Sequence, residues 1–228
     1  MPTDLEQRLD EDVEATLRRY DPYWGGQVVL AVAILFQLSL SEQLTVGPRW
    51  LLPALEAVAL VALAIASPHP RMRHNPLRRR LVLTLIGVVS AANAYSLAML
   101  VHFLVRGGKV TGHALIGSGV VLWVTNVLLF GVWYWQLDRG GPAARRLKRQ
   151  PHPDFLFPQM TDDAKGLAPR GWEPTLLDYL YTSFTNSTAF SPTDTMPLTP
   201  MAKALMAGQS LVALTTVGLV FARAVNIL

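Results

Sequence analysis

Five long apolar segments constrain the fold of this 228-residue chain more than any other feature. Each approaches or exceeds the roughly 20 residues that a helix needs to cross the ~30 Å hydrocarbon core of a bilayer. In lipid, every backbone N–H and C=O must find its partner within its own segment, and the segments lack the alternation typical of barrel strands. The sequence therefore predicts an all-α, polytopic helical membrane protein. The predicted spans are 24–40, 50–66, 81–105, 112–137 and 201–227.

Basic residues are unevenly distributed between the connections. Lys and Arg are retained on the cytoplasmic side of a membrane during insertion. The N-terminal arm (1–22), the loop 67–80 and the segment 138–174 carry three, five and seven of them, whereas 41–49 and 106–111 carry one and two. This asymmetry predicts a multi-pass protein of the plasma (inner) membrane with a cytoplasmic N-terminus. Orientation also explains the net charge of +4 without a nucleic-acid partner.

Motifs of enzymes and metal sites are absent from the sequence. The chain has no cysteine, which excludes disulfides, thiolate metal ligands and thiol nucleophiles. Its five histidines show no metal-ligand spacing, and it has no His-Glu-x-x-His, phosphate-binding glycine loop or nucleophile elbow. We therefore expect no catalytic residue, metal or cofactor, and a protein that is not an enzyme. The histidines are His69, His74, His102, His113 and His152.

The N-terminal arm has the pattern of an amphipathic helix. Thr3-Asp-Leu-Glu6 is a capping box, and apolar residues follow at intervals of four. A cytoplasmic helix of this kind can lie on the inner membrane face, bind a partner, or cover the cytoplasmic end of its own protein. The apolar residues are Leu5, Leu9, Val13 and Leu17.

Glu56 is a carboxyl group about two turns inside the second predicted span. Acids within membrane helices are rare and commonly functional, so Glu56 is a candidate transport or gating group. Alternatively, it reaches the interface or pairs with a neighbouring helix. A proton-linked carrier would use such a group, but the sequence lacks the inverted repeats typical of carriers. The small and hydrogen-bonding residues of the third and fourth spans are explained by close helix packing.

The C-terminal region combines a short polar helix with a long apolar one. The predicted helix 175–190 ends in hydroxyl and amide side chains, and an oxygen-rich segment containing Asp194 follows it. This order resembles the pore helix, filter and inner helix of a potassium-channel-like pore-loop protein. The resemblance implies a cation path lined by oxygens that replace the water shell of the ion. Its residues would be Thr185, Asn186, Ser187, Thr188, Phe190, Ser191, Thr193 and Asp194.

The segment 190–193 departs from a potassium filter in its centre. Phe190-Ser191-Pro192-Thr193 stands where those channels have Gly-Tyr-Gly. Without glycine, and with φ fixed at the proline, the backbone cannot easily aim successive carbonyls inward. We therefore expect hydroxyls and Asp194 to set a weaker preference for monovalent cations. The final helix carries a small and polar stripe suited either to a water path or to a buried seam: Gln209, Ala213, Thr216, Val220 and Arg223.

The segment 175–190 follows a basic linker that is predicted to be cytoplasmic. It is therefore either re-entrant, giving five spans, or crossing, giving six. Sixteen helical residues rise only about 24 Å, and polar side chains are costly against lipid, so the re-entrant topology is favoured. One such segment per chain would require several copies around an axis, a tetramer by analogy with potassium channels.

The chain thus divides into an amphipathic helix (1–22), a four-helix transmembrane region (23–137), a basic linker (138–174) and a pore-loop-like module (175–228). The linker can also contact anionic lipid headgroups. The alternative function is a non-conducting membrane scaffold that binds lipid or a protein partner. The last fifty residues are also similar to a bacterial inner-membrane family of unknown function, a resemblance that implies no activity.

Overall fold

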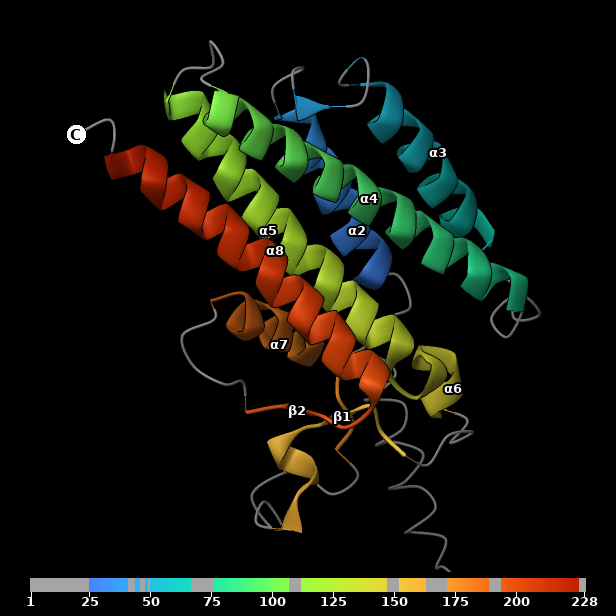
Figure 1. Cartoon of the computed structure of the whole chain (residues 1–228). Coiled ribbons are helices and arrows are strands. Elements are labelled where there is room, and N and C mark those ends of the chain that lie inside the picture. The colour runs from blue at the N-terminus through green and yellow to red at the C-terminus, as the bar shows by residue number, and fades with distance from the viewer. Residues whose placement is uncertain are drawn as a thin grey trace, which may run out of the picture.

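A computed structural model describes residues 25–40, 44–45, 48, 50–66, 76–106, 112–146, 152–162, 172–188 and 194–225 (Figure 1). The amphipathic helix expected in the N-terminal arm lies outside these residues. So do Phe190, Ser191 and Thr193 of the candidate path.

The long helices coincide with the predicted spans. They are α2 (Gly25–Leu38), α3 (Leu51–Ala66), α4 (Pro76–Arg106), α5 (Gly112–Leu137) and α8 (Pro200–Val225). The all-α class is therefore confirmed. Among the described residues, three helical segments are long and apolar enough to cross a bilayer, which is compatible with a membrane protein: Arg79–Arg106, Leu115–Gly140 and Pro200–Ala222. The apolar helices α2 and α3 are shorter, with 14 and 16 residues.

Helix α4 begins five residues before the span predicted at 81. Its first turn holds Pro76 and a run of arginines. Proline suits the first position of a helix because the N–H that it lacks would have no partner there. Hydropathy marks only the apolar part of a helix, so it missed this polar first turn.

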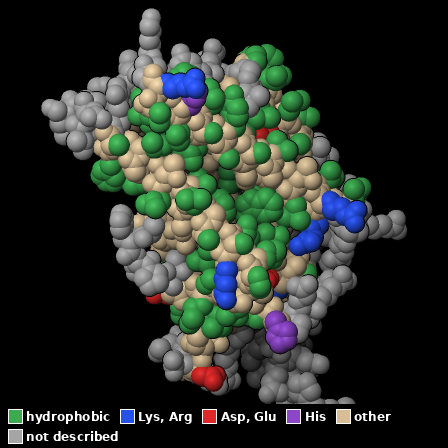
Figure 2. Space-filling view, viewed as in Figure 1, with side chains coloured by type: hydrophobic (Ala, Val, Ile, Leu, Met, Phe, Trp, Pro, Cys, Tyr) green, Lys and Arg blue, Asp and Glu red, His purple; other side chains and the backbone are tan. Residues whose placement is uncertain are grey.

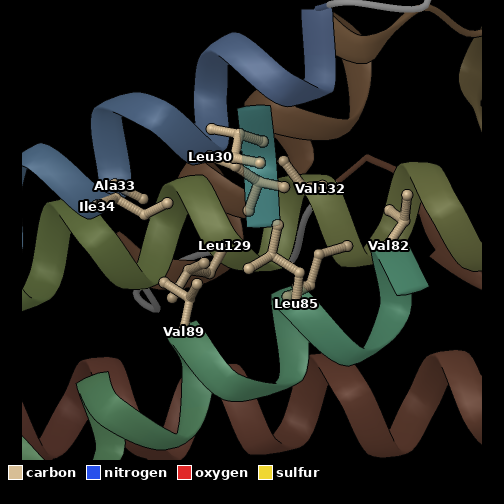
Figure 3. Close-up of a cluster of buried hydrophobic side chains, with 10 residues drawn as sticks. Leu30, Ala33, Ile34, Val82, Leu85, Val89, Leu129 and Val132 are labelled. Atoms are coloured by element: carbon tan, nitrogen blue, oxygen red, sulfur yellow. The ribbon is translucent and has the colours of Figure 1, made fainter. Parts of the chain in front are cut away.

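Helix α5 packs against α2, α4, α7 and α8, while α3 packs against α2 and α4 (Figure 1). Side chains of α2, α4 and α5 interlock in one apolar cluster. In Figure 3, Leu30 and Ile34 of α2 and Val89 of α4 surround Leu129 of α5. The cluster consists of Leu30, Ala33, Ile34, Leu60, Val82, Leu85, Ile86, Val89, Leu129 and Val132.

Two further clusters lie at opposite ends of the bundle. At the end where α5 finishes and α8 begins, aromatic and apolar residues pack together: Tyr134, Trp135, Phe155, Phe157, Tyr179, Ala202 and Met206. We call this the aromatic end. At the other end, the leucine end, the first part of α5 packs against α4 and the residues that follow α2: Leu40, Leu44, Leu97, Leu100, Leu115 and Leu122.

The outside of the bundle is rich in apolar side chains. Figure 2 shows hydrophobic side chains over the viewed face with few Lys and Arg among them. Large exposed apolar surfaces on a folded chain indicate contact with lipid or with another protein. Such residues occur on every long helix, including Leu35, Leu55, Val58, Val88, Val120, Leu211, Leu214 and Phe221.

Helix α7 (Leu176–Thr188) is flanked on both sides by segments at the aromatic end. Strand β1 (Phe155–Leu156) pairs antiparallel with β2 (Met196–Pro197), in the register Phe155↔Pro197. Trp172, just before α7, packs its ring edge-on to Phe157 at a centroid distance of 5.8 Å. The chain therefore enters α7 and returns from it at the same end of the bundle (Figure 1).

Candidate functional site

Helix α7 lies antiparallel to α5 and reaches about half its length. Near the aromatic end, the Tyr179 hydroxyl donates to Asp138 Oδ2 at 2.5 Å. One turn further along α7, Ser183 Oγ donates to the carbonyl of Val127 at 2.7 Å. At the last turn, Trp123 Nε1 donates to the carbonyl of Ser187 at 3.4 Å. The C-terminus of α7 therefore lies beside the middle of α5.

A glycine allows this close approach of the two helices. A Cβ added at Gly131 of α5 would lie 2.6 Å from Leu180 Cδ2 and 3.0 Å from Leu180 Cα. Small residues at helix contacts let backbones approach closely in lipid. The sequence alone does not distinguish Gly131, because its place on α5 does not reveal which helix faces it.

Gln209 of α8 is fully buried and joins three helices. Its Oε1 accepts hydrogen bonds from the Tyr134 hydroxyl and from Asn186 Nδ2, the latter at 2.9 Å. Its Nε2 lies 2.6 Å from Ser183 Oγ, 2.7 Å from Ser187 Oγ and 2.9 Å from the Ser183 carbonyl. Two N–H groups serve these acceptors. We call this set of residues on α5, α7 and α8 the Gln209 network.

The predicted stripe on α8 faces inward, as far as its side chains are described. Thr216 is 1% exposed and its hydroxyl donates to the Val212 carbonyl of its own helix at 2.8 Å. Val220 meets Gly119 of α5, where an added Cβ would lie 2.4 Å from Val220 Cγ2. Ala213 is also buried. The stripe was expected to line a water path or to form a buried seam. Its contacts within one chain are those of a buried seam. Arg223 belongs to α8, but its side chain lies outside the description.

The predicted path residues of α7 point in two directions. Asn186 and Ser187 take part in the Gln209 network, whereas Thr185 and Thr188 face an open cleft of about 270 Å³ together with Asp194. Residues three or four apart share one face of a helix, so the cleft follows α7 along its length. The other lining residues are Asp178, Tyr181, Thr182 and Thr195, with Phe157, Pro158 and Gln159 at the aromatic end.

Three threonine hydroxyls of the cleft donate to backbone carbonyls of α7. Thr182 Oγ1 donates to the Asp178 carbonyl at 2.9 Å, Thr185 Oγ1 to the Tyr181 carbonyl at 3.0 Å, and Thr188 Oγ1 to the Thr185 carbonyl at 2.8 Å. Each hydroxyl oxygen keeps acceptor capacity. With the carboxylates of Asp178 and Asp194, these threonines give the α7 side of the cleft several acceptors, and the Gln159 amide and the Tyr181 hydroxyl add donors to the same lining.

Asp178 also begins the helix. Its Oδ2 accepts hydrogen bonds from the backbone N–H and the hydroxyl of Thr175, both at 2.7 Å. This arrangement is related to a capping box and places a negative charge at the positive N-terminus of α7. The start of the helix was predicted here from the sequence, but a role of Asp178 in the path was not.

Two acids, the buried Asp138 and the half-buried Asp154, hold the aromatic end together. Asp138 is fully buried, and its Oδ1 accepts from the backbone N–H of Asp154 at 2.8 Å. Asp154 in turn accepts at its carboxylate from the Arg139 N–H and the Thr199 hydroxyl, both at 2.8 Å. Its backbone carbonyl accepts from the Leu198 N–H, also at 2.8 Å. This Asp138–Asp154 clamp joins the end of α5, the linker, and the start of α8.

Tyr179 and Arg145 complete the clamp. Burial raises the pKa of the Tyr179 phenol well above its ordinary value, so the hydroxyl remains a donor to Asp138 at neutral pH. Arg145 Nη1 donates to the carbonyls of Trp135 and Asp138, at 2.7 and 3.0 Å. Its guanidinium carbon lies 5.2 Å from the centre of the Tyr179 ring, within the range of a cation–π contact. The sequence indicated a basic linker but not these buried contacts.

Glu56 lies on α3, apart from the C-terminal cleft. It is 2% exposed, and its Oε2 accepts a hydrogen bond from Gln37 Nε2 of α2 at 3.2 Å. Its Oε1 has no hydrogen-bond partner among the described residues. Pairing with a neighbouring helix was one of the alternatives for Glu56, and its hydrogen bond with Gln37 is a contact of that kind.

The described residues contain no group of three or more His, Asp or Glu side chains that could hold a metal ion. Comparisons of the chain with protein-family models, curated proteins and solved structures found no match.

Proposed function

We propose that the protein is a channel-like membrane protein in which several copies of the chain enclose a water-filled cation path. The path is lined by the outer face of α7 and by the segment around Asp194. The polar cleft along α7 carries this proposal, because it lies beside helices whose outer surfaces are apolar. Polar groups at membrane depth are costly against lipid, so water or another copy must cover the cleft.

The position of α7 supports a re-entrant topology. Thirteen helical residues rise about 20 Å, less than the ~30 Å hydrocarbon core. Both flanks of α7 lie at the aromatic end, beside the β1–β2 pair. With the basic linker in the cytoplasm, α7 enters from that side, and the chain has five spans and a cytoplasmic N-terminus.

The charge of the cleft favours cations. Thr185 and Thr188 present oxygens whose protons are already donated to backbone carbonyls, and Asp178 and Asp194 add negative charge. The C-terminus of α7 carries the negative end of the helix dipole to the middle of the bundle. These groups can replace part of the water shell of a monovalent cation and would repel chloride.

One cleft on the outside of one chain does not make a closed path. Copies arranged around an axis would place their clefts against a shared channel, and cyclic symmetry is the usual way in which identical chains close. A tetramer is the expected assembly by analogy with pore-loop channels, and Asp194 would then form a ring.

Ion flux through purified protein in liposomes tests this proposal. We expect potassium or sodium flux that exceeds chloride flux, and a lower or less cation-selective flux for Asp194→Asn. The matched control is Glu173→Gln, which neutralises an exposed acid that does not line the cleft. Flux that is unchanged by Asp194→Asn, or that prefers chloride, contradicts the proposed lining.

A non-conducting scaffold is the second candidate. The Gln209 network favours it, because Asn186 and Ser187 are bonded within the protein and α7 can therefore serve as a structural wedge between α5 and α8. A folded oligomer of the wild-type chain that passes no ion under any gradient would establish this role instead.

A further inference from the structure

Glu56 is a buried acid, and no Lys, Arg or His of the described residues forms an ion pair with it. It is the one charged residue within the sequences of α2 and α3. On α4, which also packs against α3, Arg79, Arg80 and His102 are exposed. The other titratable groups of α4 are Arg78, Tyr95 and Arg106, and Tyr95 is 42% exposed.

The hydrogen bonds of Glu56 leave one oxygen available. Gln37 is a neutral donor to Oε2, and the described residues offer no partner to Oε1. A charged carboxylate in an apolar site needs a cation or several donors, and a single amide does not replace them. The carboxyl group fits this site when Oε1 carries a proton.

A small cavity lies beside Gln37, the hydrogen-bond donor to Glu56. It measures about 10 Å³ and is lined by Gln37, Thr45, Pro48, Pro53 and Ser96, among others. This volume holds about one water molecule, and the cavity contains polar side chains that can bind it. Gln37 both lines the cavity and donates to Glu56, so it lies between the two.

The cavity lies toward the leucine end. Thr45 and Pro48 belong to the connection between α2 and α3, and Leu44 of the same connection packs in the leucine-end cluster. The cleft along α7 begins at the other end, beside Phe157. The two sites therefore face opposite ends of the bundle.

We propose that Glu56 and Gln37 form a proton-binding site within the membrane that exchanges protons with water at the leucine end, through the cavity beside Thr45. The proton moves between Glu56 Oε1 and a water molecule, with no other bond broken. This inference does not depend on ion conduction along α7.

Infrared spectroscopy of the full chain in lipid tests the site. We expect a carbonyl band of a protonated carboxylic acid at neutral pH, which is lost in Glu56→Gln. Glu173→Gln removes an exposed acid and should leave the band unchanged. In Gln37→Leu the band should move to higher frequency, because the carbonyl oxygen of Glu56 loses its hydrogen-bond donor.

Three results would overturn the inference. They are the absence of the band in folded wild-type protein, a band that persists in Glu56→Gln, and a band that fades when sodium or potassium is added at constant pH, since a metal cation would then occupy the site. Transfer to D₂O tests the water route, and a band that does not shift in folded protein contradicts it. If Glu56→Gln fails to fold, a shift of the carbonyl band in Gln37→Leu still assigns the band to Glu56. An unshifted band in Gln37→Leu refutes that assignment.

Discussion

Replacing Gln209 with leucine should weaken the attachment of α7 to α8 and lower the free energy of unfolding moderately. Leucine nearly preserves the volume of the side chain but removes its amide. Two acceptor contacts of Oε1 and two N–H donations of Nε2 are then lost. Hydrogen bonds between membrane helices contribute about 0.6 kcal/mol each on average, so Gln209→Leu should lower the free energy of unfolding by about 2 kcal/mol.

Reversible unfolding of the protein in mixed detergent and denaturing-detergent micelles measures this loss. Thr215→Val is the matched control on the same helix, because the Thr215 hydroxyl donates to the Leu211 carbonyl of its own helix. We expect the control to differ from wild type by less than about 0.5 kcal/mol. If Gln209→Leu is as stable as Thr215→Val, the Gln209 network does not hold α7 in place.

Two other contacts of α7 and its flanks give further predictions. Gly131→Ala should lower the free energy of unfolding by about 1–3 kcal/mol, because its Cβ meets the Leu180 backbone, whereas Gly117→Ala, with open space around its Cβ, should not be destabilising. Both are checked by the same unfolding titration, and equal effects would refute the close approach. Asp154→Ala should lower the free energy of unfolding by about 1–3 kcal/mol, since the Thr199 hydroxyl and the Arg139 backbone N–H both lose the carboxylate to which they donate. Faster amide hydrogen exchange at the start of α8 checks this, and unchanged exchange would show that the clamp does not hold that end.

Hydropathy predicted where the long helices lie because each apolar block satisfies its own backbone as a helix. The bounds of α5, 112–137, were predicted to the residue. The short helix α7 was predicted at 175–190 from its polar end and observed at Leu176–Thr188. Hydropathy did not show the polar first turn of α4, nor the two-residue strands that close the segment around α7.

The candidate site could be predicted only in part, because periodicity identifies a face of a helix but not its neighbour. Gln209 stood on a polar stripe, yet nothing in the sequence distinguished water from Asn186 and Tyr134 as its surroundings. The Asp138–Asp154 clamp joins residues that are far apart in the chain, and a pattern of spacing does not reveal such pairs.

Neighbouring positions at the end of α7 give the most direct test of the water path. The natural chain has no cysteine, so single cysteines can be introduced without background. Thr188 is exposed on the cleft, whereas Ser187 is 2% exposed and bonded to Gln209. The measurement is the reaction of Thr188→Cys and Ser187→Cys with a cationic, membrane-impermeant thiol reagent in liposomes. We expect Thr188→Cys to react from the cytoplasmic side with loss of ion flux, and Ser187→Cys to be protected. Equal protection of both cysteines in the bilayer would contradict a water-filled path along α7.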